Sequence, residues 1–339
     1  MTPDPLDFWK KYELIASSKT YVPTNIKSKV CRYCERTDEE TTFTQDTHLL
    51  PELIGENDIL TFDECDICNK LFSNYESSFS IFIRPYITLL GVKGKKKIPT
   101  FQSRTVDRNE ETRTTLKHKE GNQKELHIQS LDDYTINPET KTFEIVFRKP
   151  PFIPLKVYKS LLKIGLSLLP KKFDKFNKQS FAWLTNRQED LNFICYAFIT
   201  SLKRKYFSKP SADLYRAKKL FKGKEEFPEH ILILCFANQI VQIFLPFSDE
   251  LKNVHDNKRQ LVLDLLPAFA FDKIETSQTV EIKTFNLGIG TSITEDHKIS
   301  FKYDSADINI PPNNNSLWTR KHEPLTLCVL KKAPDLKTD

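Results

Sequence analysis

Glycine is scarce in this sequence. The 339 residues include 8 glycines, against 19 prolines and 25 phenylalanines. Neither G-x-G-x-x-G nor G-x-x-x-x-G-K-[ST] occurs, and these are the glycine-rich loops that bind phosphate groups in dinucleotide-binding and P-loop folds. The sequence therefore excludes a nucleotide site built on either loop.

Long apolar runs are also lacking. No segment approaches the roughly 18 consecutive apolar residues that mark a membrane-spanning helix. The N-terminal stretch MTPDPLDFWKKYELIASSK contains early acids and a Trp-Lys-Lys run but not the apolar core of a signal peptide. We expect a soluble, cytoplasmic protein that makes no contact with a membrane.

Charged residues are unevenly distributed along the chain, although the net charge is only +6. Residues 1–83 carry a net charge of −7, residues 84–124 of +7 and residues 125–339 of +6. A basic run within residues 84–124 is predicted to contact nucleic-acid phosphates, through Lys93, Lys95, Lys96, Lys97 and Arg104. A solvated loop explains the same lysines equally well.

The hydrophobic pattern indicates an α+β fold with a mostly antiparallel sheet. Apolar residues at helical spacing predict helices over 6–20, 155–170 and 188–203. In the second of these, Val157 and Leu161 belong to one apolar face, and the helix is expected to end at the proline of its last position. Runs rich in β-branched and aromatic residues after position 229 predict the strands.

The same pattern divides the chain into three consecutive parts. Residues 1–90 are predicted to form a strand–loop–strand–helix module preceded by a short helix. Residues 91–142 form a basic, polar connecting segment, which we interpret as strands with exposed loops or as a linker. Residues 143–339 form a larger α+β domain, whose role is open between substrate selection, sensing and self-association as a homodimer.

Cysteine occurs in two different settings. Four of the seven cysteines form two C-x-x-C pairs, Cys31 with Cys34 and Cys65 with Cys68, separated by 30 residues. Each pair can present two thiolates to one ion, so together they predict a tetrahedral zinc site. The cysteines alone are compatible with a purely structural zinc, whereas a thioredoxin-like redox role lacks its β–α–β setting. The other three lie singly in apolar segments, as buried cysteines do: Cys195, Cys235 and Cys328.

The residues between and after the two pairs carry a more specific pattern. They read THLLPELIG, which contains His48, and then CDICN, in which Asn69 follows the last cysteine and a helix begins. Together with the cysteines, this pattern resembles the zinc-supported form of the HNH endonuclease family, whose members are also called His-Me finger or ββα-metal nucleases. The resemblance covers about residues 31–80, less than a quarter of the chain.

The resemblance implies a metal-dependent endonuclease and assigns two roles. His48 is the general base that deprotonates the attacking water, a role that suits an imidazole because it titrates near neutral pH. Asn69 is a ligand of the catalytic Mg²⁺ or Mn²⁺, a hard ion that prefers oxygen donors. The zinc holds the helix start against the strand that carries the base. The resemblance also implies nucleic acid as the partner, favours DNA over RNA, and suggests a part in bacterial antiviral defence or in a mobile element.

One position departs from the family pattern. Family members commonly place an acidic metal ligand immediately before the general base, and here that residue is Thr47. Asp46 lies one residue earlier and points to the other face of a regular strand. Three interpretations stay open: a metal site with Asn69 as its one protein ligand, recruitment of Asp46 through a bulge, or a non-catalytic, zinc-supported module that binds nucleic acid or protein. Glu52 and Glu76 are candidates for supporting carboxylates.

Overall fold

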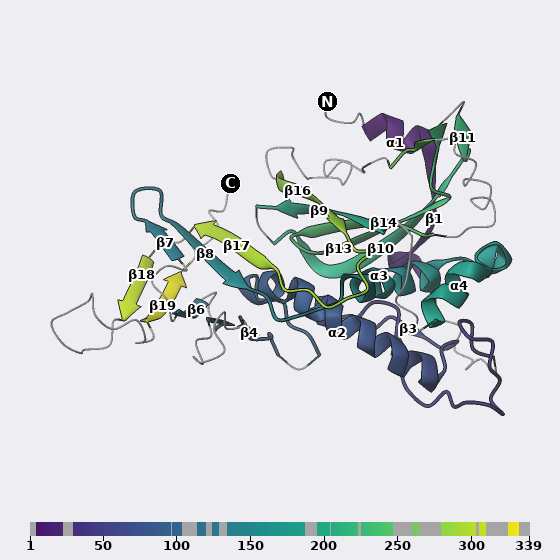
Figure 1. The fold of residues 1–339 in the computed structure, drawn as a ribbon, viewed down its shortest axis with the longest axis horizontal. Helices are drawn as coiled ribbons and strands as arrows, with labels where there is room; N and C mark the ends of the chain where they lie inside the picture. Colours follow the sequence, from purple (N-terminus) through teal and green to yellow (C-terminus); the bar gives the residue numbers. More distant parts are fainter. Residues whose placement is uncertain are drawn as a thin grey trace. The chain divides into compact units, whose positions relative to one another are not determined.

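The computed structural model describes residues 5–22, 30–95, 97–103, 114–119, 124–128, 134–186, 195–203, 205–222, 225–246, 260–263, 265, 279–302, 305–309 and 325–331. The fold is mixed α+β with mostly antiparallel sheets (Figure 1), which confirms the fold class predicted from the sequence. Within these ranges, no helix has the length and the apolar character needed to cross a membrane.

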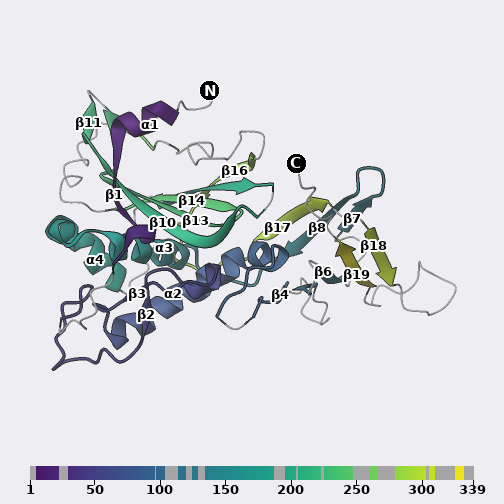
Figure 2. The same cartoon turned by 180° about the vertical axis from the view of Figure 1, so that it is seen from behind.

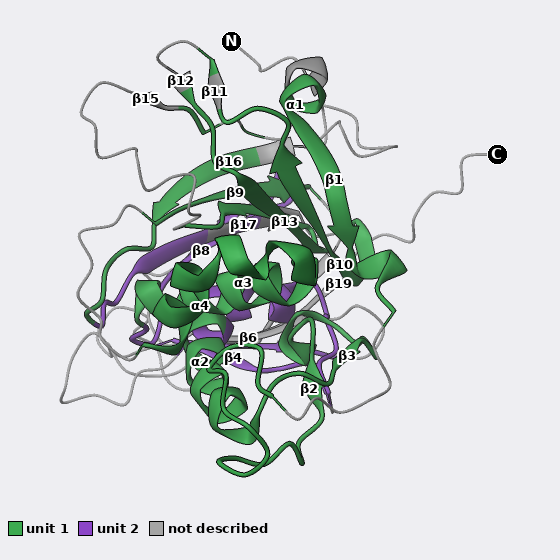
Figure 3. Ribbon diagram, turned by 90° about the vertical axis from the view of Figure 1, so that its right-hand side faces the viewer, with its two compact units in different colours: residues 1–79, 153–291 green, residues 80–152, 292–339 purple. Residues whose placement is uncertain are grey.

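The chain forms two compact units, each made of two separate stretches (Figure 3). Unit 1 contains Met1–Phe79 and Ile153–Thr291, and unit 2 contains Ser80–Phe152 and Ser292–Asp339. This division differs from the three consecutive parts that the sequence suggests. Hydrophobic patterns report local order, whereas a compact unit is defined by elements that pack together from distant stretches of chain.

A six-stranded antiparallel sheet lies at the centre of unit 1 (Figures 1 and 2). Its strand order is β1-β10-β13-β14-β9-β16. These strands are β1 (Tyr12–Ser17), β9 (Tyr196–Leu202), β10 (Phe207–Ala217), β13 (His230–Ala237), β14 (Gln239–Phe244) and β16 (Thr279–Asn286). Every residue of β13 and β14 is buried, so the core of the unit lies at the middle of this sheet.

Helices and shorter strands surround this sheet. They are α1 (Pro5–Lys11), η1 (Ser18–Thr20), α3 (Pro154–Leu168), η5 (Lys171–Phe176), α4 (Lys178–Thr185), β11 (Phe221–Lys222), β12 (Glu225–Glu226) and β15 (Gln260–Leu261). Helix α3 covers one face of the sheet (Figures 1 and 2), where the Tyr158 hydroxyl donates to the Phe244 carbonyl at 2.6 Å. The three short strands form a sheet of their own.

The elements between the cysteine pairs and the helix after them also belong to unit 1. They are β2 (Thr47–His48), η2 (Glu52–Ile54), β3 (Leu60–Thr61) and α2 (Asp66–Leu89). β2 pairs antiparallel with β3, and α2 continues past residue 79 into unit 2. The structure thus has the strand–loop–strand–helix order that the sequence predicts for this segment.

Helix α3 confirms the helix predicted over 155–170. Pro154 stands in its first turn, where the missing N–H would have no helical partner, and Pro170 follows its end. The helix is buried along nearly its whole length, and its buried residues include Lys159 and Lys163. Because a buried ammonium group is costly unless it is paired, both lysines need partners inside the protein.

The helix predicted over 188–203 is wrong for the part that the structure describes, since Tyr196–Leu202 is strand β9. This strand pairs with β14 on one side and with β16 on the other. A short apolar run fits a buried strand and a buried helix equally well. Pairing with strands that are distant in sequence decides between the two.

The helix predicted over 6–20 is only partly correct. α1 ends at Lys11, and β1 begins at Tyr12 and pairs with β10, with Tyr12 opposite Ala217. Phe8 and Tyr12, four residues apart, still lie together, with 4.9 Å between their ring centroids. The backbone pairing with β10 was not visible in the local pattern.

Unit 2 is built from short antiparallel strands. One sheet has the order β17-β8-β7 and another the order β18-β19-β6-β5-β4. The strands are β4 (Phe101–Gln102), β5 (Thr115–His118), β6 (Lys124–Ile128), β7 (Tyr134–Asn137), β8 (Thr142–Arg148), β17 (Asp296–Lys302), β18 (Ser305–Asn309) and β19 (Leu325–Lys331). Strands β4 to β7 fall within the segment 91–142, which agrees with the interpretation of that segment as strands and loops.

His230 is fully buried at the start of β13. Neither ring nitrogen has a hydrogen-bond partner among the residues that the structure describes. The ring packs against Phe173, with 5.7 Å between ring centroids, and its Nε2 lies 3.9 Å from Glu229 Oε1. Burial, and then the charge of Arg216, lower the pKa of His230 to about 3. The folded protein therefore keeps this imidazole neutral in mild acid.

The lowered pKa predicts a loss of stability in mild acid. The unfolded chain binds a proton at His230 below about pH 6.5, whereas the folded chain does not bind it until the pH approaches about 3, so the free energy of unfolding falls as the pH drops below about 6.5. Between pH 7 and pH 5 the loss is about 2 kcal/mol. We expect His230→Leu to remove this component, as measured by urea unfolding at both pH values. The same loss of unfolding free energy in wild type and His230→Leu would show that folding does not lower the pKa of His230.

Candidate functional site

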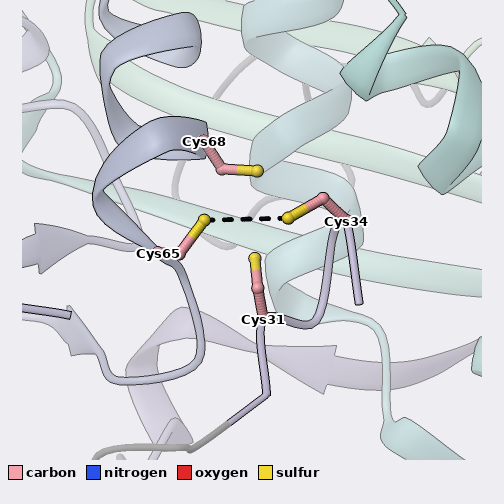
Figure 4. Close-up of side chains that lie close together, drawn as sticks. All are labelled: Cys31, Cys34, Cys65 and Cys68. Atoms are coloured by element: carbon pink, nitrogen blue, oxygen red, sulfur yellow. Dashed lines mark hydrogen bonds between the residues drawn. The ribbon is translucent and has the colours of Figure 1, made fainter. Parts of the chain in front are cut away.

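The two cysteine pairs come together in unit 1 and form a cluster of four sulfur atoms (Figure 4). In this cysteine cluster all sulfurs lie within 4.8 Å of one another, and Cys34 Sγ is 3.7 Å from Cys65 Sγ. A disulfide requires about 2.05 Å, whereas sulfurs held at about 2.3 Å around a tetrahedral zinc ion lie about 3.8 Å apart. The spacing fits four thiolates around one ion, so the cluster can bind a metal such as zinc.

The cysteine cluster favours the thiolate form of one of its members. A hydrogen bond from the Cys68 thiol and hydrogen bonds from nearby backbone N–H groups lower the pKa of Cys31 to about 5, against the opposing effect of burial. The same hydrogen bond raises the pKa of Cys68, and burial raises the pKa of Cys34. Metal binding requires deprotonated thiols, so an ion at this position would displace the remaining thiol protons.

Arg32 and Tyr33, inside the first cysteine pair, attach that pair to the α3 region. Arg32 forms a two-pronged ion pair with Asp174 of η5, with N–O distances of 3.1 and 2.6 Å, and donates to the Leu169 carbonyl at 2.5 Å. The Tyr33 hydroxyl lies 2.7 Å from Ser167 Oγ. These contacts join the first cysteine pair to α3 and η5 of unit 1.

Asp66, the first residue of α2, holds the loop that leads into β2. Its carboxylate accepts hydrogen bonds from Thr42 Oγ1 at 2.5 Å, Thr44 N at 3.0 Å and Gln45 N at 3.0 Å. Burial acts to raise the pKa of Asp66, but these hydrogen bonds outweigh it and lower the pKa well below its usual value. The loop before β2 and the first turn of α2 are therefore joined by direct protein contacts.

His48 is the second residue of β2 and lies opposite Leu60 of β3. Its side chain is 22% exposed, and its Nε2 lies 3.9 Å from Glu52 Oε2. Nδ1 is buried and makes no hydrogen bond within the described part of the chain. The imidazole thus has a carboxylate near Nε2 and a buried, unbonded Nδ1, and a partly exposed imidazole beside a carboxylate can accept a proton.

A buried ammonium group contacts the backbone of His48. Lys163 of α3 donates from Nζ to the His48 carbonyl at 2.5 Å and lies 3.3 Å from Glu64 Oε2. Burial raises the pKa of Glu64 to about 7, although Lys163 acts to lower it. Burial also raises the pKa of Glu76, whose carboxylate interacts with the charges of Lys163 and Glu52. Three carboxylates and one ammonium group therefore share the neighbourhood of His48.

Asn69 follows the cysteine cluster directly and lies at the start of α2, where its N–H donates to the Cys65 carbonyl at 2.9 Å. Glu76 comes seven residues later on the same helix. Residues seven apart lie on the same face of a helix, so Asn69 shares its face with Glu76. The helix face that carries the predicted metal ligand is thus the face that carries a carboxylate of the His48 neighbourhood.

Thr47 uses its hydroxyl within the β2–β3 pair. The side chain is buried, and Oγ1 donates to the Thr61 carbonyl at 2.6 Å and lies 2.9 Å from Thr61 Oγ1. Asp46, which precedes Thr47 in the chain, is exposed. The position at which HNH nucleases commonly carry an acidic ligand therefore faces β3 in this protein.

The predicted phosphate-binding residues belong to unit 2, whereas the cysteine cluster and His48 belong to unit 1. Lys93, Lys95 and Lys97 are exposed after the end of α2. Lys96 and Arg104 lie outside the described residues. Exposed lysines are compatible both with phosphate contacts and with a solvated loop.

Sequence reasoning missed Lys163, Glu64 and Asn57. Asn57 donates from Nδ2 to the carbonyls of Leu50 and Gly55 at 3.2 and 3.1 Å, which ties down the loop between β2 and β3. A signal for Lys163 was present, because a lysine inside an apolar helix must be paired when the helix is buried. No local pattern pointed to Glu64, whose burial depends on a helix that is distant in sequence.

The structure brings the four cysteines together, places the His48 ring beside Glu52, and sets Asn69 directly after the cysteine cluster. Comparison of the chain with known protein families, curated proteins and solved structures found no match. The inference of function therefore rests on the motif of cysteines, His48 and Asn69 and on the contacts that hold it.

Proposed function

We propose that this chain is a metal-dependent endonuclease of the HNH type that hydrolyses phosphodiester bonds in DNA. The observation that carries the proposal is the setting of His48, on a short strand pair tied at both ends to the metal-binding region. Before the pair, Asp66 N donates to the Thr42 carbonyl at 2.8 Å. After it, Glu64 leads directly into the second cysteine pair. A partly exposed imidazole held this way beside a carboxylate is suited to act as a base.

The cysteine cluster binds one structural zinc ion in this proposal. Four thiolates complete a tetrahedral shell, so the ion has no open position for water or substrate and takes no direct part in the reaction. It aligns the first turn of α2 with the chain on either side of β2. This alignment sets the position of Asn69 relative to His48.

His48 removes a proton from the water that attacks the phosphorus. Its side chain is partly exposed and can reach solvent, and the Glu52 carboxylate lies 3.9 Å from Nε2. Nδ1 is buried and makes no hydrogen bond within the described chain, so no internal hydrogen bond competes for the ring. The ring that holds the proton then lies beside a carboxylate during bond cleavage.

Asn69 would hold the catalytic Mg²⁺ or Mn²⁺ through its side-chain oxygen, with water molecules as the other ligands. Such an ion, when bound, offsets the negative charge of the phosphate and of the leaving oxygen. Glu76 shares the helix face of Asn69, and its carboxylate interacts with that of Glu52, which lies beside His48. These relations support a single acidic site that includes both Asn69 and His48. Acidic groups attract divalent cations to this region.

Attraction of the DNA itself has to come from other parts of the chain. Residues 1–83, which contain the proposed site, carry a net charge of −7, whereas residues 84–124 carry +7. The exposed Lys93, Lys95 and Lys97 are suited to contact phosphates. Cleavage is therefore expected to weaken steeply as the salt concentration rises.

A non-catalytic role is favoured by one observation, the burial of Thr47. Its hydroxyl is committed to Thr61, so this position supplies neither charge nor an exposed oxygen to a divalent ion. In this second function the catalytic metal site is degenerate, and the chain uses the zinc-supported fold to bind nucleic acid or protein without cutting. This second function predicts DNA binding or protein binding that does not depend on Mg²⁺.

The direct test is cleavage by the full-length protein. Supercoiled plasmid, linear DNA and RNA are incubated with it in the presence of Mg²⁺, of Mn²⁺ and of neither ion. We expect nicking and linearisation of plasmid only when a divalent ion is present. Binding of DNA without cleavage of any substrate under these conditions would overturn the nuclease proposal and support the non-catalytic module.

The Asn69→Ala protein is expected to need more metal. Loss of one ligand oxygen should raise the Mg²⁺ concentration for half-maximal cleavage by at least about tenfold, because even changes next to a ligand lower metal affinity by about 10- to 100-fold. Asn69→Asp keeps an oxygen and should need little additional Mg²⁺. Asn74→Ala, an exposed asparagine on the same helix, is the matched control and should behave as wild type. Equal Mg²⁺ requirements in all four proteins would remove Asn69 from the site.

A further inference from the structure

Lys163 is an unusual residue for the middle of a buried helix. Its side chain is 4% exposed, yet it carries a charge and lies among apolar residues of α3. The ammonium group has two partners, both outside the helix: the His48 carbonyl at 2.5 Å and Glu64 Oε2 at 3.3 Å. A buried charge is tolerated only when its surroundings compensate for the lost water, so these two contacts decide where Lys163 lies.

The contact to His48 completes the bonding of one peptide group. On the N–H side, Leu49 donates to the Ile59 carbonyl at 2.8 Å. On the C=O side, the His48 carbonyl accepts from Lys163. Because the peptide group between residues 48 and 49 is planar, bonds at both of its ends fix its orientation. That orientation constrains the backbone at His48, from which the imidazole projects.

The strand pair alone offers little to hold His48 in place. β2 and β3 comprise two residues each, and they pair through Thr47 with Thr61 and through His48 with Leu60. Isolated two-stranded pairs are marginal in water even when they are longer. An external support for the end of β2 is therefore needed if the imidazole is to stay in one position.

Glu64 connects the same ammonium group to the metal-binding region. Its side chain is 1% exposed, and it immediately precedes Cys65 of the cysteine cluster. Neither Oε1 nor Oε2 of Glu64 makes a hydrogen bond within the described residues, so the 3.3 Å ion-pair contact between Oε2 and Lys163 Nζ is the main compensation for this buried carboxylate. Lys163 thereby links three segments: the end of β2, the second cysteine pair, and a helix 115 residues further along the chain.

We propose that Lys163 is a positioning residue for His48, held in place by Glu64, and that α3 is in this way an integral part of the catalytic site. The inference rests on the proposed nuclease function for its kinetic test. It gives helix α3 a defined role, the support of the general base, beyond any role in substrate selection. The zinc module is then incomplete without this segment.

The test uses three full-length variants: Lys163→Met, Lys163→Met with Glu64→Gln, and Lys163→Arg. The first should lower kcat for plasmid cleavage by about tenfold or more with little change in KM, because the base is displaced by a fraction of an ångström to an ångström while DNA binding is unaffected. The double variant removes the buried charges from both partners and should regain stability without regaining kcat. Lys163→Arg keeps a cationic donor and should restore part of the rate.

Lys159→Met is the matched control. Lys159 lies one turn earlier on α3, is equally buried, and donates to the Asn186 carbonyl at 2.7 Å rather than to the strand pair. Its loss should lower the stability of the fold but leave kcat per folded molecule unchanged. A double variant that recovers both stability and kcat would show that Lys163 acts on stability alone and would overturn the proposal.

A readout without cleavage separates this inference from the nuclease proposal. Hydrogen exchange of the Leu49 amide, whose N–H is bonded to Ile59, should become much faster in the double variant, while the amides of α3 stay protected. This result would support the positioning role even if the wild-type protein cut no nucleic acid. Unchanged protection of the Leu49 amide in the double variant would refute the positioning role, whatever the wild-type activity.

Discussion

The Cys65→Ser protein is expected to lose its zinc and the native structure of residues 31–79. The Cys65 side chain is fully buried in the cysteine cluster, and its sulfur lies 3.7 Å from that of Cys34. A structural zinc site contributes on the order of 10 kcal/mol of binding free energy to folding, which is comparable to the roughly 5–15 kcal/mol that stabilises a whole domain. Loss of one ligand should therefore unfold residues 31–79 and not merely slow a reaction.

Elemental analysis, circular dichroism and limited proteolysis measure this effect. Wild type should contain about one zinc per chain, in line with a site of four thiolates. Cys65→Ser should contain little zinc and be cut by protease within 31–79. Cys195→Ala, which removes a buried cysteine outside the cysteine cluster, is the control and should keep its zinc. A Cys65→Ser protein that stays folded, or a wild type indifferent to strong chelators, would show that the cluster needs no metal.

The second large effect is expected from His48→Ala. Removal of a general base lowers the rate of a reaction by about 10²- to 10⁴-fold. The fold should survive, because the His48 side chain is partly exposed and Lys163 bonds to its backbone carbonyl, which alanine retains. Zinc content and DNA binding should therefore remain at wild-type levels while plasmid nicking falls close to the background. Initial rates of nicking at saturating Mg²⁺ measure the loss.

Asp46→Asn is the matched comparison for His48→Ala. Asp46 is exposed two residues before His48, and its recruitment as a metal ligand is one of the interpretations that the sequence leaves open. We expect Asp46→Asn to cut DNA at the wild-type rate, because the exposed Asp46 side chain lies outside the β2–β3 pair that carries the base. A large rise in its Mg²⁺ requirement would instead make Asp46 a ligand. Equal nicking by wild type and His48→Ala would remove His48 from the reaction.

Much of the metal-binding region was predictable because its signals are local. A C-x-x-C pair places two thiolates within reach of one ion whatever the rest of the chain does, and two such pairs suffice for one site. Helix α3 was predictable for a similar reason, since its apolar period and flanking prolines act over a few residues. The α+β class followed from the alternation of such segments.

Other elements depended on partners that are distant in sequence. Tyr196–Leu202 became a strand because β14 and β16 flank it, and Tyr12 begins a strand because β10 pairs with it. The two units likewise combine stretches from both halves of the chain. A hydrophobic pattern contains no record of these partners, so it could indicate burial but not the backbone conformation.

The sequence by itself determined which side chains can bind a metal and which imidazole stands between the two pairs, because these properties depend on residue type and short spacing. Only the tertiary structure decided that Thr47 turns toward Thr61, that Glu52 approaches the His48 ring, and that Lys163 supports the His48 backbone. The physical reason is that a buried charge must find its partner in space. For Lys163, that partner lies on a strand 115 residues away along the chain.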